Sequence, residues 1–359
     1  MRVAGIMSGT SLDGIDVAIV DIEGKRIDVV THCTFPYTDK VREHILAVSD
    51  ATAHTSRISR LNFVLADLYA KAVRKCGVPL NTIDLVGSHG QTVYHEQQST
   101  LQLGDGSVLA EKLGIPVVSD FRTRDMAAGG KGAPLVPFVD HMLYVHSELG
   151  RVALNIGGIA NVTAIPPDGA PEQVVAFDTG PGNMIIDQLV AIHTRNRRKY
   201  DSGGQIAARG KVNQKLLDSL VRRTYYRQPP PKTAGREQYG QEFVRDLIRT
   251  EVPMIDLIAT ATALTPATIA FGLKKFVRHP VDEIIVSGGG AHNRTLMAYL
   301  QAFLPAVKLR TSTEFGIDSD AKEAIAFAIL AYETWHRRPS NLPSATGARH
   351  PVILGKVSF

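Results

Sequence analysis

Hydrophobic and polar residues near the start of the chain predict two strands joined by a polar turn. An apolar run at residues 3–7 stops at this turn, and alternation resumes at Ile15 and Val17. The turn, residues 8–16, contains two glycines, three hydroxyl side chains and two carboxylates. Glycines allow consecutive backbone N–H groups to line one concavity, which suits a polyphosphate, and carboxylates can hold Mg²⁺. An ordinary hairpin turn rich in Gly and Ser is the alternative.

The pattern that follows predicts further strands and helices. We expect a third strand at residues 27–35 and helices at residues 40–48 and 58–76, the last with apolar residues at helical spacing. A shorter helix is expected at residues 107–113, with Ser107 as its N-cap.

Two polar loops follow predicted strands of this first half. A buried strand from Ile83 runs into a loop that carries His89 and Gln91, and open α/β sheets place ligands at such strand ends. A histidine in such a loop is, by itself, compatible with a structural role. The combination of His89 with Gln91 favours a substrate contact. The second loop, residues 120–137, contains Arg122 and other charged residues before a run of glycines. Arginine in this loop can bind a carboxylate or phosphate through two hydrogen bonds. The alternative is a surface loop whose charged side chains pair with one another.

The pattern restarts near residue 150 with another strand, glycine turn and strand. Two such hairpins, each opening one half of the chain, indicate a duplicated fold that closes on a nucleotide from both sides. We therefore expect a first domain at residues 1–150 and a second at residues 151–335, with the tail at residues 336–359 packed on the first.

An apolar strand at residues 174–178 ends in Asp178, and a Gly-Pro-Gly turn separates it from a helix that starts near Asn183. A carboxylate fixed at the end of a strand is well placed to act as a general base. Asp178 could instead cap the following helix, but Asn183 is available as a cap, so the base is favoured.

Elements in the remaining part follow from the same periodicities. They are a helix ending at Leu220, an insertion at 225–240, helices from Phe243 and at 266–277, a strand at 281–286 and a helix at 324–335. Three glycines, Gly288, Gly289 and Gly290, leave the strand at 281–286 and permit close approach of a base or ribose to the backbone.

Composition indicates a globular protein without a membrane partner. The 359 residues exceed a single core, 44% are hydrophobic and 21% are charged. No apolar run approaches the roughly 20 residues that span a bilayer, and the N-terminus lacks the layout of a signal peptide. Two cysteines, Cys33 and Cys76, predict no disulfide framework and a cytoplasmic location.

The net charge of +5 raises the possibility of a nucleic-acid partner. The densest basic stretches, residues 195–199 and 222–227, adjoin helical patterns and belong to no nucleic-acid module, so solvated helix ends are favoured. The sequence contains neither a P-loop motif, nor a dinucleotide fingerprint after a strand, nor a zinc-binding cysteine cluster.

Five motifs together resemble the anhydro-N-acetylmuramic acid kinase family. They are residues 5–16 (GIMSGTSLDGID), 88–92 (SHGQT), 155–163 (NIGGIANVT), 177–183 (FDTGPGN) and 287–293 (SGGGAHN). The resemblance runs from residue 5 to about residue 330, and one departure is Lys131, where the family pattern leads us to expect Gln. It implies the acetate and sugar kinase, Hsp70 and actin superfold: a two-domain, actin-like ATPase (ribonuclease H-like) α/β fold with a nucleotide cleft between domains.

The resemblance also implies a reaction. ATP phosphorylates O6 of 1,6-anhydro-N-acetylmuramic acid while water opens the anhydro bridge at C1, giving N-acetylmuramate 6-phosphate for peptidoglycan recycling and amino-sugar catabolism. Asp178 matches the catalytic aspartate and deprotonates the water, as the base of an inverting glycosidase does. O6 is captured by the γ-phosphoryl group, so no carboxylic acid is needed to protonate it.

The remaining roles implied by the resemblance concern the nucleotide and the sugar. The ATP contacts are Gly9, Thr10, Ser11, Leu12, Asp13, Gly14, Ile15 and Asp16 on the phosphates, Gly157 and Gly158 opposite, and Gly288, Gly289 and Gly290 along the adenosine. Mg²⁺ lies near Asp13 or Asp16. The candidate sugar contacts are His89, Gln91, Asp105, Arg122 and Arg124, with Glu323 as a weaker candidate that is equally compatible with a helix surface.

Relatives suggest a homodimer. The alternatives are another sugar kinase of the superfold, a nucleotide-gated ATPase like Hsp70 or actin, and a basic nucleic-acid-binding protein.

Overall fold

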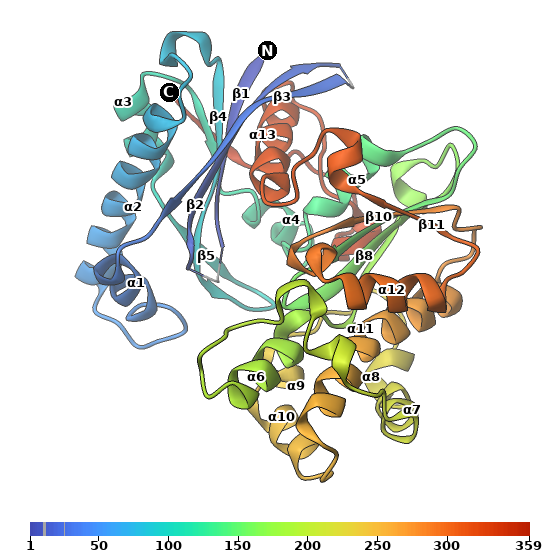
Figure 1. The fold of residues 1–359 in the computed structure, drawn as a ribbon. Coiled ribbons are helices and arrows are strands. Elements are labelled where there is room, and N and C mark those ends of the chain that lie inside the picture. Colours follow the sequence, from blue (N-terminus) through green and yellow to red (C-terminus); the bar gives the residue numbers. More distant parts are fainter. Residues whose placement is uncertain (10–11, 25) are drawn as a thin grey trace. The chain divides into compact units, whose positions relative to one another are not determined.

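A computed structural model describes residues 1–9, 12–24 and 26–359. The chain forms two compact units (Figure 1): unit 1 consists of Met1–Leu143 and Gly316–Phe359, and unit 2 of Tyr144–Phe315. Each unit combines a β-sheet with helices, which confirms the predicted α/β class. Unit 2 is therefore an insertion in the chain of unit 1.

Among the described residues, unit 1 holds a seven-stranded sheet in the order β12-β6-β4-β1-β2-β3, with β5 paired to β4. Its strands are β1 (Arg2–Ser8), β2 (Gly14–Glu23), β3 (Arg26–Pro36), β4 (Leu85–His95), β5 (Thr100–Leu103), β6 (Val117–Ser119) and β12 (Lys356–Ser358). The β1–β2 and β2–β3 pairs are antiparallel, whereas β1, β4 and β6 run parallel. The predicted hairpin and third strand are present.

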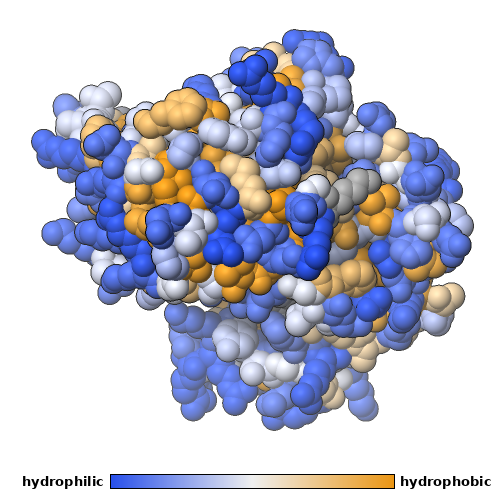
Figure 2. Space-filling model, turned by 90° about the horizontal axis from the view of Figure 1, so that it is seen from above, coloured by the Kyte–Doolittle hydropathy of each residue, from blue (hydrophilic) through white to orange (hydrophobic). Residues whose placement is uncertain are grey.

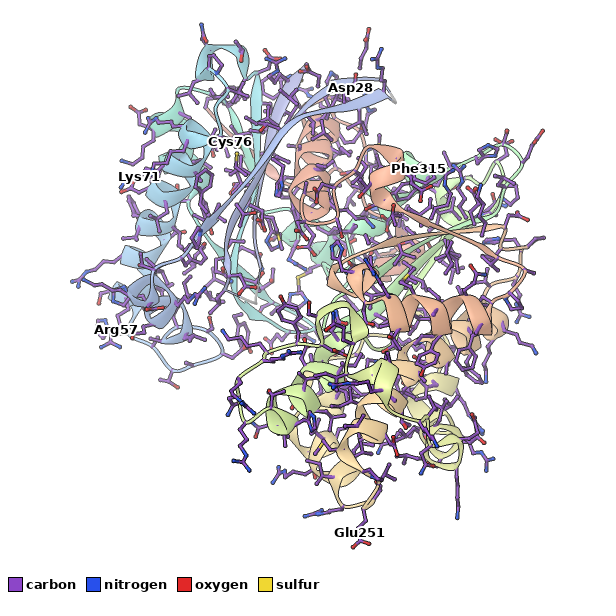
Figure 3. The ribbon with its side chains drawn as sticks, in the orientation of Figure 1. Asp28, Arg57, Lys71, Cys76, Glu251 and Phe315 are labelled. Carbon is purple, nitrogen blue, oxygen red and sulfur yellow. The ribbon has the colours of Figure 1, made fainter. Side chains whose placement is uncertain are left out.

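Helices cover both faces of this sheet. They are α1 (Asp39–Leu46), α2 (Thr55–Lys75), α3 (Gly106–Leu113), α4 (Thr123–Ala127), α5 (Val136–Tyr144, which ends at the first residue of unit 2), α13 (Lys322–Trp335) and α14 (Pro343–Thr346). Figure 1 shows α2 and α13 on opposite sides of the sheet. Alternate residues of β1 serve the two faces, because Ile6 packs in the core with α2 and Val3 in the core with α13. In Figure 3, Cys76 lies between α2 and the sheet, whereas Lys71 projects outward.

Helix α13 lies directly on the sheet backbone. A Cβ atom on Gly5 of β1 would be 1.9 Å from the Ala324 carbonyl oxygen, and one on Gly87 of β4 would be 2.2 Å from the Phe327 carbonyl oxygen. The sequence interpretation placed residues 316–335 in the second domain, whereas this contact puts α13 in unit 1. The tail also lies in unit 1, where β12 pairs with β6.

Unit 2 repeats the same strand order. Its five-stranded sheet, again among the described residues, runs β11-β10-β7-β8-β9. The strands are β7 (Arg151–Ile156), β8 (Ile159–Ile165), β9 (Val175–Pro181), β10 (Glu283–Ser287) and β11 (Lys308–Thr311). In both units an antiparallel three-stranded meander is followed by two strands parallel to the first, which is the ribonuclease H-like order. The repeat confirms the predicted duplicated, actin-like fold.

The helices of unit 2 include one that the sequence interpretation divided. They are α6 (Asn183–His193), α7 (Gln214–Val221), α8 (Thr224–Arg227), α9 (Arg236–Tyr239), α10 (Gln241–Ile248), α11 (Met254–Phe276) and α12 (Arg294–Phe303). A helix was expected to begin at Pro266, but Pro266 lies inside the 23-residue α11. Packing explains the tolerance, because most residues around Pro266 are buried and tertiary contacts outweigh helix propensity.

Helix α11 is also long and apolar enough to cross a membrane, contrary to the expectation from the sequence. Because 72% of its apolar window is buried inside the structure, it fits the core helix of a globular unit equally well. The basic stretch at residues 195–199 follows α6 and is exposed, as expected for a solvated helix end. On the face drawn in Figure 2, hydrophilic residues surround smaller hydrophobic patches.

Candidate functional site

The turn between β1 and β2 carries the first group of predicted nucleotide contacts. Thr10 and Ser11 lie outside the described residues. Leu12 adopts a positive φ of 60°, and its N–H donates to the Gly9 carbonyl oxygen at 3.2 Å. Leu12 and Ile15 are buried, whereas Asp13 is exposed. Leu12 and Ile15 can therefore offer only backbone groups to a ligand.

Three side chains from elsewhere in unit 1 hold this turn. Gln91 accepts a hydrogen bond from the Ser8 hydroxyl at 2.6 Å and donates to the Gly9 carbonyl oxygen at 3.3 Å. Ser8 also meets the Tyr37 hydroxyl at 2.7 Å, and Arg42 donates to the Leu12 carbonyl oxygen at 2.9 Å. Because Gln91 is 1% exposed and its amide is engaged, its observed contacts are with the turn. Sequence reasoning proposed it as a sugar contact.

The acidic groups at this turn suit a divalent cation. Thr34 donates to Asp16 at 2.6 Å, and His32 lies 4.0 Å from the same carboxylate oxygen. Burial raises the pKa of Asp16, and the negative charges of Asp320 and Asp13 raise it further, against the effect of Thr34 and His32. Unneutralised carboxylates of this kind favour a bound cation.

No group of three or more His, Cys, Asp or Glu side chains in the described part of the chain could hold a metal by itself. Mg²⁺ commonly uses one or two carboxylates together with phosphates and water, so Asp13 and Asp16 fit this mode of binding.

His89, which is buried, and Arg122, which is half-buried, form a pair in which the histidine is the acceptor. Arg122 donates to His89 Nε2 from Nε at 3.1 Å and from Nη2 at 2.9 Å, and its Nη1 donates to the Gly132 carbonyl oxygen at 3.0 Å. The other ring nitrogen, Nδ1, lies 2.7 Å from the Gly90 carbonyl oxygen. Nδ1 therefore carries the proton, and His89 is neutral.

Burial and then the charge of Arg122 lower the pKa of His89 to about 3. His89 is 3% exposed, and both its nitrogens are engaged within the protein. The geometry therefore makes it a support for Arg122. Burial lowers the pKa of Arg122 to about 10, and its remaining N–H groups can hold an anion.

The loop that carries Arg122 is ordered by a buried carboxylate. Asp125, which is fully buried, accepts hydrogen bonds from Gly132 N–H at 2.8 Å, Asn341 Nδ2 at 2.6 Å and the Thr346 hydroxyl at 2.7 Å. The segment at 120–137 is therefore tied to the C-terminal tail. It also contains α4, which was not expected from the sequence.

A polar cavity of about 320 Å³ lies in unit 1 beside β4 and the end of β6. Its lining includes His89, Asp105, Ser88 and Ser119. The Ser88 hydroxyl is buried and has no hydrogen-bond partner among the described residues. The size suits a monosaccharide, and the unsatisfied hydroxyl suits a polar ligand.

Other predicted sugar contacts have different surroundings. Asp105, not Ser107, is the N-cap of α3 and accepts hydrogen bonds from the Ser107 and Val108 N–H groups at 3.0 and 3.1 Å. The helix thus begins one residue earlier than expected. Arg124 is exposed on α4, and Glu323 is exposed in the first turn of α13.

In unit 2 the glycine motifs converge at one end of the sheet. The N–H of Gly182 donates to the Gly158 carbonyl oxygen at 2.9 Å, and the N–H of Asn183 donates to the Gly157 carbonyl oxygen at 2.8 Å. A Cβ atom on Gly182 would lie 2.2 Å from the Gly157 carbonyl oxygen. The β7–β8 turn and the start of α6 are therefore locked together by backbone contacts.

The three glycines after β10 reach the same place. Gly288 has a positive φ of 82°, and a Cβ atom on it would lie 2.5 Å from Asn155 Oδ1. A Cβ atom on Gly290 would lie 2.3 Å from Ile156 Cγ2. Gly289 is exposed and faces more open space. Gly288 and Gly290 are thus required by packing against β7, and Gly289 leaves backbone accessible to a ligand.

Asp178 lies in β9 and does not cap α6. Its Oδ2 accepts a hydrogen bond from the Ala234 N–H at 2.8 Å. The N-cap of α6 is Gly182, without a side-chain hydrogen bond, so the expected cap from Asn183 is wrong. Burial raises the pKa of Asp178 to about 6, although the hydrogen bond from the Ala234 N–H and the positive charge of Lys232 both lower it. Such a carboxylate is ionised at neutral pH and still accepts a proton readily.

Sequence reasoning missed the buried side chain of Lys232, which is 7% exposed. From the sequence, residues 225–240 were recognised only as an insertion. A lysine in a Pro- and Arg-rich stretch gives no sign of burial, since its partners are distant in sequence.

Comparison with known sequences identifies a matching family and relatives that carry the name of that family. A family model described as anhydro-N-acetylmuramic acid kinase matches residues 1–359. The chain is 44% identical over 383 residues to the anhydro-N-acetylmuramic acid kinase of Caldanaerobacter subterraneus subsp. tengcongensis, covering 99% of this chain and 96% of the relative. It is 43% identical over 381 residues to the enzyme of the same name from Bacillus cereus strain G9842, covering 100% and 99%.

Solved structures with more distant sequences are also similar. The activator of the 2-hydroxyisocaproyl-CoA dehydratase from Clostridium difficile, with bound ADPNP, gives a TM-score of 0.48 at 12% identity, covering 93% of this chain and 95% of that one. A ROK family glucokinase from Streptomyces griseus, in complex with glucose and AMPPNP, gives 0.43 at 12% identity, covering 93% and 100%.

Proposed function

The chain belongs to the anhydro-N-acetylmuramic acid kinase family and is an ATP-dependent kinase, and we propose that it uses ATP and water to convert 1,6-anhydro-N-acetylmuramic acid into N-acetylmuramate 6-phosphate. The observation that carries this proposal is the setting of Asp178. One carboxylate oxygen is held by the Ala234 N–H, and Oδ1 accepts no hydrogen bond from the described residues. That oxygen is available to a water molecule.

Asp178 takes a proton from this water as the water oxygen attacks C1 of the anhydro sugar. The C1–O6 bond breaks, and O6 accepts the γ-phosphoryl group of ATP, so ADP leaves. The pKa of about 6 keeps Asp178 ionised at neutral pH, as a base requires. No separate acid is needed, because the phosphoryl group captures the leaving oxygen.

We assign the nucleotide contacts to backbone groups of the glycine turns. The turn at Gly9–Asp16 binds phosphate oxygens, and Gly158 offers a further N–H group, whereas the Gly157 N–H donates to the Ile159 carbonyl oxygen at 3.2 Å. Gly289 gives the adenosine access to backbone. Asp13 and Asp16 hold Mg²⁺, which neutralises phosphate charge when it is bound.

For the sugar we assign Arg122 to the lactyl carboxylate, with His89 holding its guanidinium in place. The polar cavity next to His89 suits the pyranose, with Asp105 and Ser88 among its lining residues. Gln91 acts through the phosphate turn. Arg124 stays a proposal on the family resemblance alone, whereas Glu323 also lies close enough for its charge to act on Asp16 and Arg122.

The first experiment measures ADP release with Mg-ATP and the anhydro sugar in ¹⁸O-water, followed by mass spectrometry of the product. We expect ADP formation and one ¹⁸O at C1 of a 6-phosphosugar, with Asp178→Asn nearly silent. ADP release without the sugar would refute the proposal in favour of a nucleotide-gated ATPase. Turnover only with other sugars in a substrate panel would indicate a different sugar kinase.

We also propose a cytoplasmic location and a homodimer. The two free thiols, Cys33 and Cys76, suit a reducing compartment. The homodimer rests on the family resemblance. Light scattering at the mass of one chain, 38.9 kDa, would contradict it.

A further inference from the structure

The segment that follows α7 grips Asp178 at three points. The Asp178 N–H donates to the Lys232 carbonyl oxygen at 3.1 Å, and the Tyr225 hydroxyl donates to the Asp178 carbonyl oxygen at 2.9 Å. The Ala234 N–H donates to the carboxylate at 2.8 Å. The backbone N–H, the backbone carbonyl oxygen and one carboxylate oxygen of Asp178 are thus all hydrogen-bonded to residues about 50 positions later in the chain.

Lys232 anchors this segment through an unusual burial. Its ammonium donates to the carbonyl oxygens of Tyr225 and Tyr226, each at 3.2 Å. It also lies 4.7 Å from the ring centroid of Phe276, 4.9 Å from Tyr225 and 5.6 Å from Phe177. Burying an ammonium costs free energy that cation–π contacts and two hydrogen bonds only partly offset. The cost of this burial indicates that Lys232 has a role besides stabilising the fold.

We propose that Lys232 is a positioning residue for Asp178: its ammonium fixes the segment at 225–234 that holds the aspartate, and its positive charge keeps the carboxylate ionised. The two side chains form no direct ion pair, so Asp178 keeps an oxygen for water. This inference deepens the proposed function and rests on the role of Asp178 as the base.

The surrounding charges define how the pair responds to pH. Burial, and then the positive charge of Lys275 on α11, lower the pKa of Lys232 to about 8, while Asp178 opposes this. The other titratable groups on this side are Tyr225, Tyr226, Glu237 and Tyr239 on α8 and α9, and Arg223, whose charge acts on Tyr226 and Tyr239. Lys232 is mostly protonated at neutral pH and loses its charge as the pH rises past about 8.

The experiment compares pH profiles of kcat and kcat/KM for the wild type and three full-length variants. Lys232→Met removes the charge and keeps an unbranched chain that suits the aromatic surroundings. Lys232→Arg keeps the charge. Lys275→Met is the matched control, because Lys275 is exposed and touches the same ring of Phe276 at 5.7 Å.

For Lys232→Met we expect the acid limb of kcat to move to higher pH by about half a pH unit or more. We also expect kcat at neutral pH to fall about tenfold or more, since small misplacements of a base are costly. KM should change little and Tm should not fall. Lys232→Arg should have the acid limb of the wild type. Because arginine stays charged, this variant should also lack the loss of activity that we expect of the wild type above pH about 8. Lys275→Met should keep the wild-type acid limb.

A lower Tm with an unshifted acid limb in Lys232→Met would show a purely structural lysine and overturn the inference. Wild-type kinetics in Lys232→Met would do the same. An inactive wild type would instead refute the proposed function, so the two failures are distinguishable.

Discussion

Replacing Asp178 by Asn should stabilise the protein while it abolishes turnover. The carboxyl has a usual pKa of 3.8, and burial raises it to about 6. At about 1.4 kcal/mol for each pH unit, the difference of about two pH units corresponds to about 3 kcal/mol against the ionised form in the folded state. Asparagine avoids this cost, and its side-chain oxygen can still accept the Ala234 N–H.

The stabilisation should depend on pH in a defined direction. The folded protein holds a proton on Asp178 more tightly than the unfolded chain, so the penalty is complete above pH about 6 and fades as the pH falls toward 4. Urea unfolding at pH 8 should therefore show the full advantage of Asp178→Asn. At pH 5 the advantage should shrink by about 1.4 kcal/mol.

Glu242→Gln, on the exposed face of α10, is the control and should change the unfolding free energy little at either pH. Equal stability of Asp178→Asn and the wild type at pH 8 would refute the reasoning. So would an advantage that is the same at both pH values, because it would then arise from packing and not from charge.

Three further changes test other parts of the molecule. Arg122→Ala should raise the KM for the anhydro sugar by about 10- to 100-fold, as expected for a lost charged hydrogen bond, with less effect on an analogue that lacks the lactyl carboxylate; equal effects on both sugars would contradict the assignment. His89→Ala should raise the same KM less, and its effect should not vary between pH 5 and 8, because burial keeps His89 neutral there; a pH-dependent effect would disagree. Gly5→Ala should lower the unfolding free energy by about 1–3 kcal/mol, because its Cβ would meet the Ala324 carbonyl oxygen at 1.9 Å; unchanged urea unfolding would argue against that contact.

The features that sequence reasoning located are those whose signal is local. Asp178 stands at the polar end of an apolar strand, and the glycine turns follow strands directly, so their positions were evident from adjacent residues. The repeated strand order was also predictable, since each half of the chain begins with the same hairpin pattern.

What could not be predicted depends on partners distant in the chain. The amide of Gln91 is engaged by Ser8 and Gly9, more than 80 residues away, so a loop glutamine looked like a ligand contact. Lys232 is buried by rings at positions 177 and 276, which no pattern around residue 232 reveals. Helix α4 has only five residues, too few for a hydrophobic period.

The insertion of unit 2 into unit 1 has a consequence for biosynthesis. Tyr144–Phe315 is a continuous segment, so unit 2 can fold on the ribosome as soon as it has emerged. The sheet of unit 1 cannot be completed at that stage, because α13 must cover Gly5 and Gly87 and β12 must pair with β6. In the nascent chain, one edge and one face of this sheet therefore stay exposed while more than 170 residues are synthesised. In that interval the sheet face over β1 and β4 and the edge of β6 are open to non-native contacts.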